Sequence, residues 1–344
     1  MAFSSLFSTI GAKLFGSNAV DTADGDLVDS MIEAIIDAVD PRLRMISGYR
    51  GQLAPGVART IAHLRTIARE LPEEPVKLSP SAWGSDLRLN ALFATSADVN
   101  AVLGRSSELR EFFEAPVNAA RAEAYGLLGM FKTERHVLAP AIVDGMLRHD
   151  VSQTTVNFGG HKLIAVAGDY HACRLEVGTR ILNRLAVLAL ERITAIGEHA
   201  VALEQRKALL AARLRLLNLR KGSIDGLGDE GAAEIVALEK ELKTASGEHA
   251  EAKASLSTLA TRLGHVTSIL DAPADYLSLA KLELRLNKMG FKVAPGSEEP
   301  ASELKLHELS MGDGLKAVIL FVRCQRAELP PRESLLARAA REIL

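Results

Sequence analysis

The sequence predicts an α+β protein in which a long antiparallel coiled-coil hairpin is inserted between segments of one sheet. Two observations point to this fold class. Two apolar ladders, over residues 182–217 and 235–270, alternate steps of three and four residues without a slip. Short extended apolar runs lie before the first ladder and after the second. The simplest topology places these runs in one mixed or antiparallel sheet, preceded by a helical N-terminal region.

The bulk composition excludes several classes of protein. The chain has 344 residues with 24% charged residues and a net charge of -2, so no overall basic field indicates nucleic acid and no acidic excess indicates disorder. Its two cysteines, Cys173 and Cys324, suit a reducing compartment. No run of 18 apolar residues and no signal peptide pattern is present, so we expect a cytoplasmic protein.

Residues 1–17 form an amphipathic N-terminal segment. Its apolar side chains occupy one narrow arc of a helical wheel, and Lys13 is the only charged residue. This pattern resembles helices that insert into packing defects of membranes. Three interpretations stay open: peripheral contact with the inner face of a membrane, docking on this protein or a partner, and a mobile tail. The residues of this apolar face are Phe3, Leu6, Phe7, Ile10 and Leu14.

Residues 21–132 are expected to be helical. The first helix has Asp26 as a plausible N-cap, carries an acidic outer face and ends at Asp40-Pro41, because a residue before proline disfavours the helical conformation. Later helices are expected to start at Ser79, with Pro80 at the first helical position, and at Ser96.

Residues 133–168 and 273–327 are expected to form the sheet. Gly159-Gly160 lies between two extended runs and predicts a two-residue hairpin turn. The continuous apolar run 317–322 is typical of a central, buried strand, and Gly312-Asp313-Gly314 is a natural turn into it. Half-exposed strands are expected at 282–286 and 304–307, and a final helix within 330–344.

The ladders predict a coiled-coil hairpin arm over residues 169–272. If Leu217 faces Ile235, Leu203 faces His249 and both ladders end together. At 1.5 Å per residue the arm is about 50 Å long. A repeated Gly-Glu-His-Ala motif places Gly197 and Gly247 inside the helices as a candidate elbow. The arm tip, expected to meet a protein partner, includes Gly222, Asp225, Gly226, Gly228 and Asp229.

A basic run within the first ladder allows two interpretations. It contains Arg206, Lys207, Arg213, Arg215, Arg220 and Lys221 without an acid. Such a run is typical of a face that follows a phosphate backbone, as in a nucleic-acid-associated accessory protein. Acids on the second ladder offer another explanation, since the proposed register brings Glu239 near Arg213. We favour charge pairs across the hairpin.

Histidines before the first ladder define a candidate metal site. The side chains concerned are those of His136, His149, His161, His171 and Cys173. Their spacings match no compact ligand motif, so a metal-dependent enzyme or regulator is the alternative and not the favoured function. On the arm, Glu198, His199, Glu248 and His249 form a second candidate set. The common ATPase, dinucleotide, metalloprotease and hydrolase signatures are absent, and we expect no cofactor.

Together these patterns favour a non-enzymatic interaction or scaffold protein. Its arm is expected to engage a protein partner, and its N-terminal segment to attach it to a membrane surface or a second protein. Assembly with further copies of the same chain is compatible with the pattern.

Overall fold

The computed structural model describes residues 10, 25–72, 74–143, 146–221, 229–287, 289–294, 297, 299–312 and 314–331, without the side chains of 141–147, 149, 221 and 229–232. The contacts divide the chain into two compact units. Unit 1 includes Ala23–Thr60 and Asn183–Pro273, and unit 2 includes Ile61–Leu182 and Ala274–Leu344. The expected final helix within 330–344 lies almost entirely outside the described residues.

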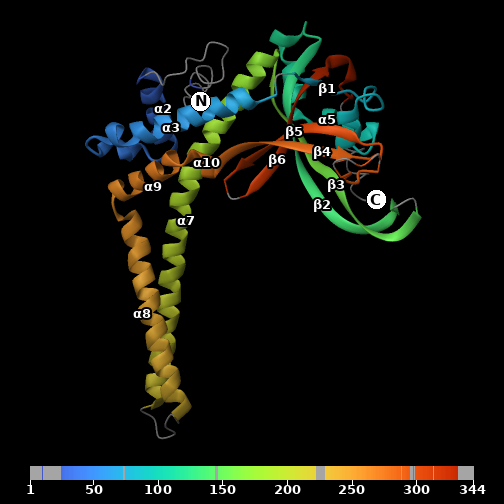
Figure 1. Ribbon diagram of the computed structural model, residues 1–344. Coiled ribbons are helices and arrows are strands. Elements are labelled where there is room, and N and C mark those ends of the chain that lie inside the picture. The colour runs from blue at the N-terminus through green and yellow to red at the C-terminus, as the bar shows by residue number, and fades with distance from the viewer. Residues whose placement is uncertain are drawn as a thin grey trace. The chain divides into compact units, whose positions relative to one another are not determined.

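Unit 2 contains the sheet (Figure 1). Its strands lie in the order β3-β2-β6-β5-β4, and each neighbouring pair in this order is antiparallel. Strand β1 pairs in parallel with β6. The combination of helices with an antiparallel sheet, and of a long helix between β3 and β4, confirms the predicted α+β class. The strands are β1 (Val76–Lys77), β2 (Glu123–Val143), β3 (Met146–Ala167), β4 (Leu277–Leu286), β5 (Ser302–Met311) and β6 (Leu315–Gln325).

Strand β6 lies inside the sheet and is covered on both faces. Val318, Leu320 and Val322 are buried in a cluster with apolar residues of three helices, α4 (Leu87–Leu92), α5 (Ser96–Arg105) and α6 (Ser107–Glu114). On the opposite face Phe321 packs edge-on against Tyr170, the first residue of α7 (Tyr170–Lys221). A strand buried on both faces needs apolar residues in succession, which explains the uninterrupted run.

The prediction of a hairpin turn at Gly159-Gly160 is wrong. Both glycines lie inside the long strand β3, next to a shift in its register with β2. Gly160 has φ +66°, as at a β-bulge, so the strand bends here without reversing. The two strands are instead joined by two residues, Asp144-Gly145, and Val143 pairs with Met146. The sheet also begins earlier than residue 133, because β2 starts at Glu123.

Two of the expected helix starts differ in outcome. Ser79-Pro80 does not begin a helix: α4 starts at Leu87, after Asp86 caps it by accepting from the N–H groups of Arg88 and Leu89. The start at Ser96 agrees with α5, whose N-cap is the preceding Thr95. Short turns complete unit 2: η2 (Pro116–Asn118), η3 (Arg326–Glu328) and α10 (Pro273–Tyr276), which begins in unit 1.

Unit 1 is helical. The boundaries between the units fall within α3 (Tyr49–Glu70) and within α7. Helix α2 ends at Val39, as expected, and Asp40 then caps a short 3-10 helix, η1 (Pro41–Met45). Asp26 lies in the first turn of α2 and not before it. The other elements are α2 (Gly25–Val39), α8 (Asp229–Ser257) and α9 (Leu259–Asp271).

No helix in the described part of the chain combines the length and apolar character that a membrane span requires.

Candidate interaction surface on the helical hairpin

Helices α7 and α8 lie side by side as an antiparallel hairpin in unit 1 (Figure 1). Their facing side chains form a small apolar core of Leu210, Leu217, Ile235, Leu238 and Ala245, with Leu214 and Leu242 packed against it. These residues all belong to the two ladders. Burial of one face of each helix supplies the hydrophobic stabilisation that joins them.

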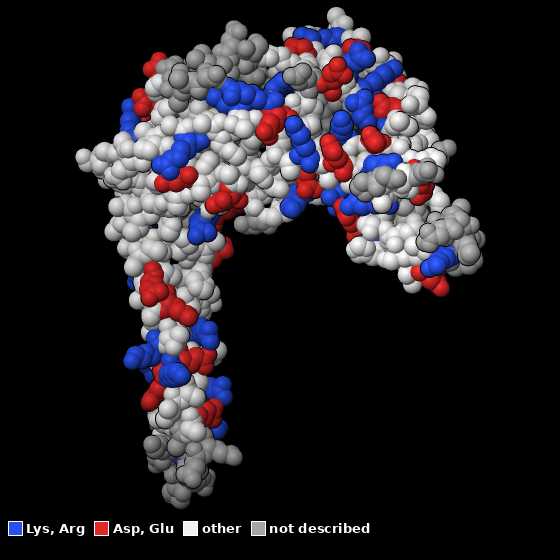
Figure 2. Space-filling view, in the orientation of Figure 1, with Lys and Arg blue, Asp and Glu red and all other residues white. Residues whose placement is uncertain are grey.

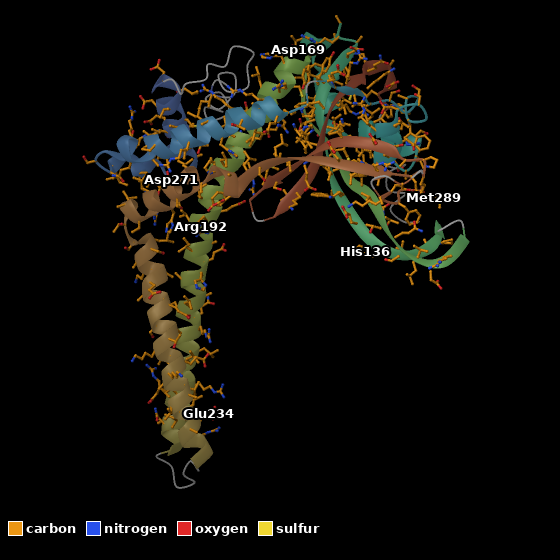
Figure 3. All side chains as sticks on the ribbon, in the orientation of Figure 1. His136, Asp169, Arg192, Glu234, Asp271 and Met289 are labelled. Carbon is orange, nitrogen blue, oxygen red and sulfur yellow. The ribbon has the colours of Figure 1, made fainter. Side chains whose placement is uncertain are left out.

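Ion pairs cross the hairpin beside this core. Arg206 contacts Glu241, and Arg213 contacts Glu234, which Figure 3 shows near the end where the helices connect. Arg213 therefore pairs with Glu234, five residues before the expected partner Glu239. On the face in Figure 2, Lys and Arg side chains alternate with Asp and Glu along the hairpin. This interspersed charge is unlike the continuous basic surface that a nucleic acid backbone requires.

A polar layer interrupts the apolar core. Lys207 and His249 occupy ladder positions, and their Nζ and Nδ1 atoms lie 3.3 Å apart. Glu204 Oε2 lies 3.3 Å from Lys207 Nζ and 3.1 Å from His249 Nε2. A polar layer of this kind costs stability and favours one alignment of the two helices, because a shift of one helix would bury these groups against apolar side chains.

Helix α7 carries a second apolar stripe on the face opposite its ladder. We call this the outer stripe. All its members are exposed and fall within an arc of about 100° on a helical wheel. Before Val201 the same arc also holds two exposed acids, Glu191 and Glu198. From Val201 onward the stripe contains no charged residue, and its leucines Leu209, Leu216 and Leu219 are 70%, 63% and 73% exposed. The outer stripe consists of Val187, Leu190, Thr194, Val201, Gln205, Ala208, Leu209, Ala212, Leu216 and Leu219.

The spacing of the outer stripe is that of a helix-packing seam. Val201, Gln205, Ala208, Ala212, Leu216 and Leu219 follow one another in steps of three and four residues. A helix with two such faces, one buried and one exposed, has a packing surface that the described structure leaves in solvent. A contiguous exposed apolar surface on a folded protein is typical of an interaction site, whereas single scattered apolar residues are not.

The outer stripe could have been found in the sequence, and our sequence analysis missed it. The signal is the pair of doublets Leu209-Leu210 and Leu216-Leu217. Adjacent residues on a helix point about 100° apart, so when one leucine of a doublet faces α8 the other cannot. We followed the ladder through each doublet and left the second leucine unexplained.

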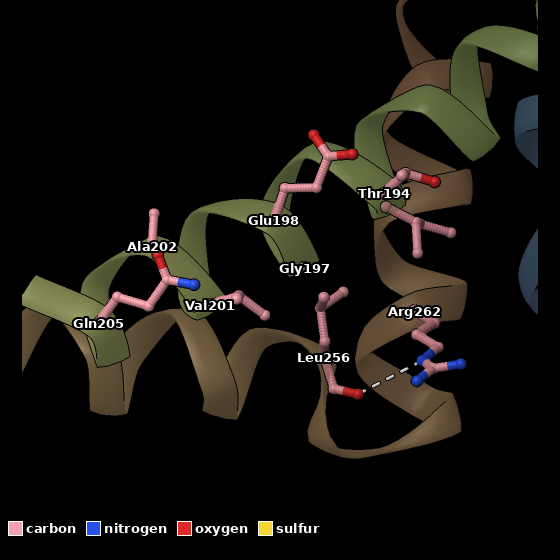
Figure 4. Close-up of a pocket in the computed structure, with 9 residues that line it drawn as sticks. Thr194, Gly197, Glu198, Val201, Ala202, Gln205, Leu256 and Arg262 are labelled. Carbon is pink, nitrogen blue, oxygen red and sulfur yellow. Dashed lines mark hydrogen bonds between the residues drawn. The ribbon is translucent and has the colours of Figure 1, made fainter.

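An open groove of about 590 Å³ hollows the middle of this surface (Figure 4). On α7 its lining includes Thr194, Gly197 and Val201. Leu256, near the end of α8, forms the opposite wall, and Arg262 of α9 lies at one end. Gly197 lacks a side chain here, and a Cβ at this position would lie 3.6 Å from Leu256. The groove is therefore mainly apolar, with Glu198, Gln205 and Arg262 as polar members of its lining, and it is open to solvent and partly continuous with the outer stripe.

A break between α8 and α9 forms one wall of the groove. The second ladder predicted a continuous helix, but Thr258 interrupts it by capping α9: its side chain and that of Thr261 each accept from the other's backbone N–H. The carbonyl left unpaired at Leu256 accepts from Arg262 Nε at 3.3 Å, and His265 Nε2 lies 3.1 Å from Ser255 O. These side chains replace the missing helical hydrogen bonds, so the break is a specific structure.

The break lies neither at the expected elbow nor at the expected tip of the hairpin. Gly197 lies inside the continuous helix α7 and Gly247 inside the continuous helix α8. Neither helix is interrupted at its glycine, and a bend at these two positions stays a prediction. Of the tip, Gly222, Asp225, Gly226 and Gly228 lie outside the described residues, and Asp229 is described only as the first residue of α8.

The N-terminal segment is described at a single position. Ile10 is helical and 1% exposed, so this member of the predicted apolar face is buried in the protein. The positions of Phe3, Leu6, Phe7 and Leu14 lie outside the described residues.

The candidate metal ligands have separate environments. His136 Nδ1 lies 3.1 Å from Thr154 Oγ1, whereas His161 Nε2 lies 2.9 Å from Leu92 O and its ring stacks on Phe93. Burial lowers the pKa of His161. Figure 3 places His136 on the β2–β3 ribbon, well away from Asp169, which is two residues before the candidate ligand His171 in the chain.

The remaining candidates do not complete a site. Cys173 is buried, and burial raises the pKa of its thiol to about 12, so the thiolate that binds metal is scarce at neutral pH. His171 is exposed, and the side chain of His149 lies outside the described residues. Within the described ranges, no group of three or more His, Cys, Asp or Glu side chains is arranged to hold a metal ion.

Comparisons with protein-family models, with curated proteins and with solved structures found no match to this chain.

Proposed function

We propose that this chain is a non-enzymatic interaction protein that binds a protein partner through the outer stripe of α7. One observation carries the proposal: the stripe is apolar, exposed and spaced as a helix-packing seam. The sequence favoured a partner at the tip of the hairpin. Because the exposed leucines lie along the side of α7, we place the proposed contact there.

We expect the partner to cover the outer stripe with a helix or a similarly narrow apolar surface, because burial of the exposed leucines would stabilise the complex. Covering a leucine side chain releases roughly 2 kcal/mol, and three of the leucines on the stripe are more than half exposed. A partner helix would lay its own apolar positions between these side chains, with the groove receiving the larger ones. The ion pairs of Arg206 and Arg213 would lie at the rim.

The role of residues 1–17 is a separate proposal. The burial of Ile10 supports docking on protein, because a side chain that is 1% exposed cannot insert into lipid in this conformation. We therefore favour protein docking over peripheral membrane attachment for this segment. The metal-dependent enzyme and the nucleic-acid-associated protein remain the alternatives, and no contact described above favours either.

The test compares two charge-introducing variants in the cells that naturally produce this chain. Leu209→Glu/Leu216→Glu places two charges on the outer stripe. Val236→Glu is the matched control, because Val236 is 66% exposed on α8 and lies outside the stripe. After chemical cross-linking and isolation of the tagged full-length protein, we expect the double variant to lose its cross-linked partner and the control to retain it.

Both variants must first match the parent in circular dichroism and melting temperature. Retention of the same partner by a correctly folded Leu209→Glu/Leu216→Glu variant would contradict the proposal.

A further inference from the structure

We propose that the second half of the outer stripe binds an acidic amphipathic helix of a protein partner. This inference rests on the proposed function and names the chemistry of the partner. We call this half the distal stripe. It consists of Val201, Gln205, Ala208, Leu209, Ala212, Leu216 and Leu219.

The two halves of the outer stripe differ in charge. The arc of the first half includes the exposed acids Glu191 and Glu198. From Gln205 to the end of α7 the helix has six basic residues and no acidic one. An acidic partner would be repelled along the first half and attracted along the distal stripe, because opposite charges across an interface favour association. We therefore place the contact on the distal stripe.

Two exposed arginines border the distal stripe. On a helical wheel Arg220 lies at one edge of the stripe and Arg215 at the other. Within the described part of the chain neither forms an ion pair, whereas Arg206 and Arg213 pair with glutamates of α8. A guanidinium can bind a carboxylate through two parallel hydrogen bonds. A helix whose apolar stripe lies between carboxylates would therefore complement both the leucines and the arginines.

The two paired arginines contribute less to this attraction. Arg206 and Arg213 have side chains that are 54% and 62% exposed, but Glu241 and Glu234 of α8 offset part of their charge. We therefore expect the partner's carboxylates to interact most strongly with the two bordering arginines.

The side chains of the distal stripe suit a helix better than a lipid surface. Ala208 and Ala212 lie among the exposed leucines, and small residues leave space in which side chains of a partner helix can pack. A helix on a membrane instead inserts large apolar side chains along its whole face. Anionic lipid would also be repelled by three acids that follow α7 in the chain, Asp225, Asp229 and Glu230. A nucleic acid backbone would contact the arginines and leave the leucines uncovered.

The length of the distal stripe limits the partner segment. Residues 201–219 extend over about 27 Å at 1.5 Å per residue, so a partner helix of about five turns covers them. Its apolar positions are expected in steps of three and four residues, with Asp or Glu on both sides. This pattern can be recognised in the sequence of a cross-linked partner.

Charge reversal in the cells that naturally produce this chain tests the sign of the partner's charge. Arg215→Glu/Arg220→Glu reverses both bordering arginines. Lys240→Glu/Lys243→Glu is the matched control, because both lysines are exposed on α8. We expect the yield of the cross-linked partner to fall by at least about tenfold in the arginine variant and by less than about twofold in the control.

A milder variant guards against a folding defect. Arg215→Gln/Arg220→Gln removes the two charges without reversing them and should give an intermediate loss of the cross-linked partner. Each variant must match the parent in circular dichroism and melting temperature before its cross-linking is compared.

Synthetic peptides measure the same preference with the purified full-length protein. Two helical peptides of about 18 residues carry the same leucines, flanked by Glu in one peptide and by Lys in the other. We expect the Glu peptide to bind at least about tenfold more tightly than the Lys peptide. This advantage should shrink at high salt and disappear in Arg215→Glu/Arg220→Glu.

Two outcomes would overturn the proposal. One is equal binding of the Glu and Lys peptides. The other is flotation of the parent, but not of Arg215→Glu/Arg220→Glu, with phosphatidylserine vesicles, because lipid would then be the ligand of this surface.

Failure of this inference is distinguishable from failure of the proposed function. If Leu209→Glu/Leu216→Glu loses the cross-linked partner while Arg215→Glu/Arg220→Glu retains it, the outer stripe binds a protein that is not acidic, and only this inference fails. If both variants retain the partner, both proposals fail. Loss in both variants, with retention in Lys240→Glu/Lys243→Glu, supports both.

Discussion

Asp40 shows how a single carboxylate joins two elements of unit 1, η1 and α9. It caps η1 by accepting from the N–H of Arg42, binds the Arg42 guanidinium, and accepts from Arg262 of α9 at 3.2 Å. The hydrogen bonds from Arg42 lower the pKa of Asp40, burial opposes them, and Arg262 lowers the pKa further. The sequence predicted the helix end at Asp40-Pro41. It could not predict Arg262, which is more than 200 residues away and reaches Asp40 only through folding.

The pH dependence of stability should therefore change in Asp40→Asn. Because the folded-state pKa of Asp40 is lowered, its contribution is present above the unfolded-state pKa and is lost as pH falls through the folded-state value. We expect Asp40→Asn to lose about 1 kcal/mol of unfolding free energy at pH 7. The difference from the parent should vanish in strong acid. Urea titrations at several pH values measure this, and a loss that does not depend on pH would contradict it.

At the scale of the element, the bulge in β3 depends on one glycine. Gly160 has φ +66°, and a Cβ there would lie 2.8 Å from the ring of Phe131, whereas a Cβ at Gly159 would meet nothing within 4 Å. Gly160→Ala should lower the unfolding free energy by about 1–2 kcal/mol, mainly through its backbone conformation, because the half-exposed Phe131 ring can move. Gly159→Ala should change it by less than about 0.5 kcal/mol. Thermal unfolding of both variants tests this, and equal losses would contradict the assignment.

The same bulge shows why some elements could not be predicted. A glycine pair between extended runs indicates a turn, and only pairing with β2 across the sheet reveals that the strand continues. The Asp144-Gly145 pair is a hairpin signal that was overlooked. Residues 317–322 were correctly expected to lie in a central strand, since burial on both faces leaves a clear apolar run. The only local signal for the break at Thr258 is weak, a threonine three residues before another threonine.

For the whole molecule, the ladders were sufficient to predict the long helix and its α+β context but not the candidate site. Periodicity identifies the face that a helix buries in its own chain, and Leu203, Leu210 and Leu217 are buried as expected. The doublets Leu209-Leu210 and Leu216-Leu217 indicate a second apolar face with the same period, but only the structure shows which of the two faces is occupied and which is exposed. The division into two units through α3 and α7 was likewise hidden, because it follows contacts between distant parts of the chain.

The most direct test of the interaction surface is site-specific photo-cross-linking of the full-length protein in its native cells. A benzophenone amino acid replaces Leu216 on the outer stripe or, as a control, Val236 on α8. We predict one dominant adduct from position 216, either with a second copy or with another protein, and none of comparable yield from position 236. Equal, diffuse labelling from both positions would contradict the central claim that the outer stripe of α7 is a binding surface.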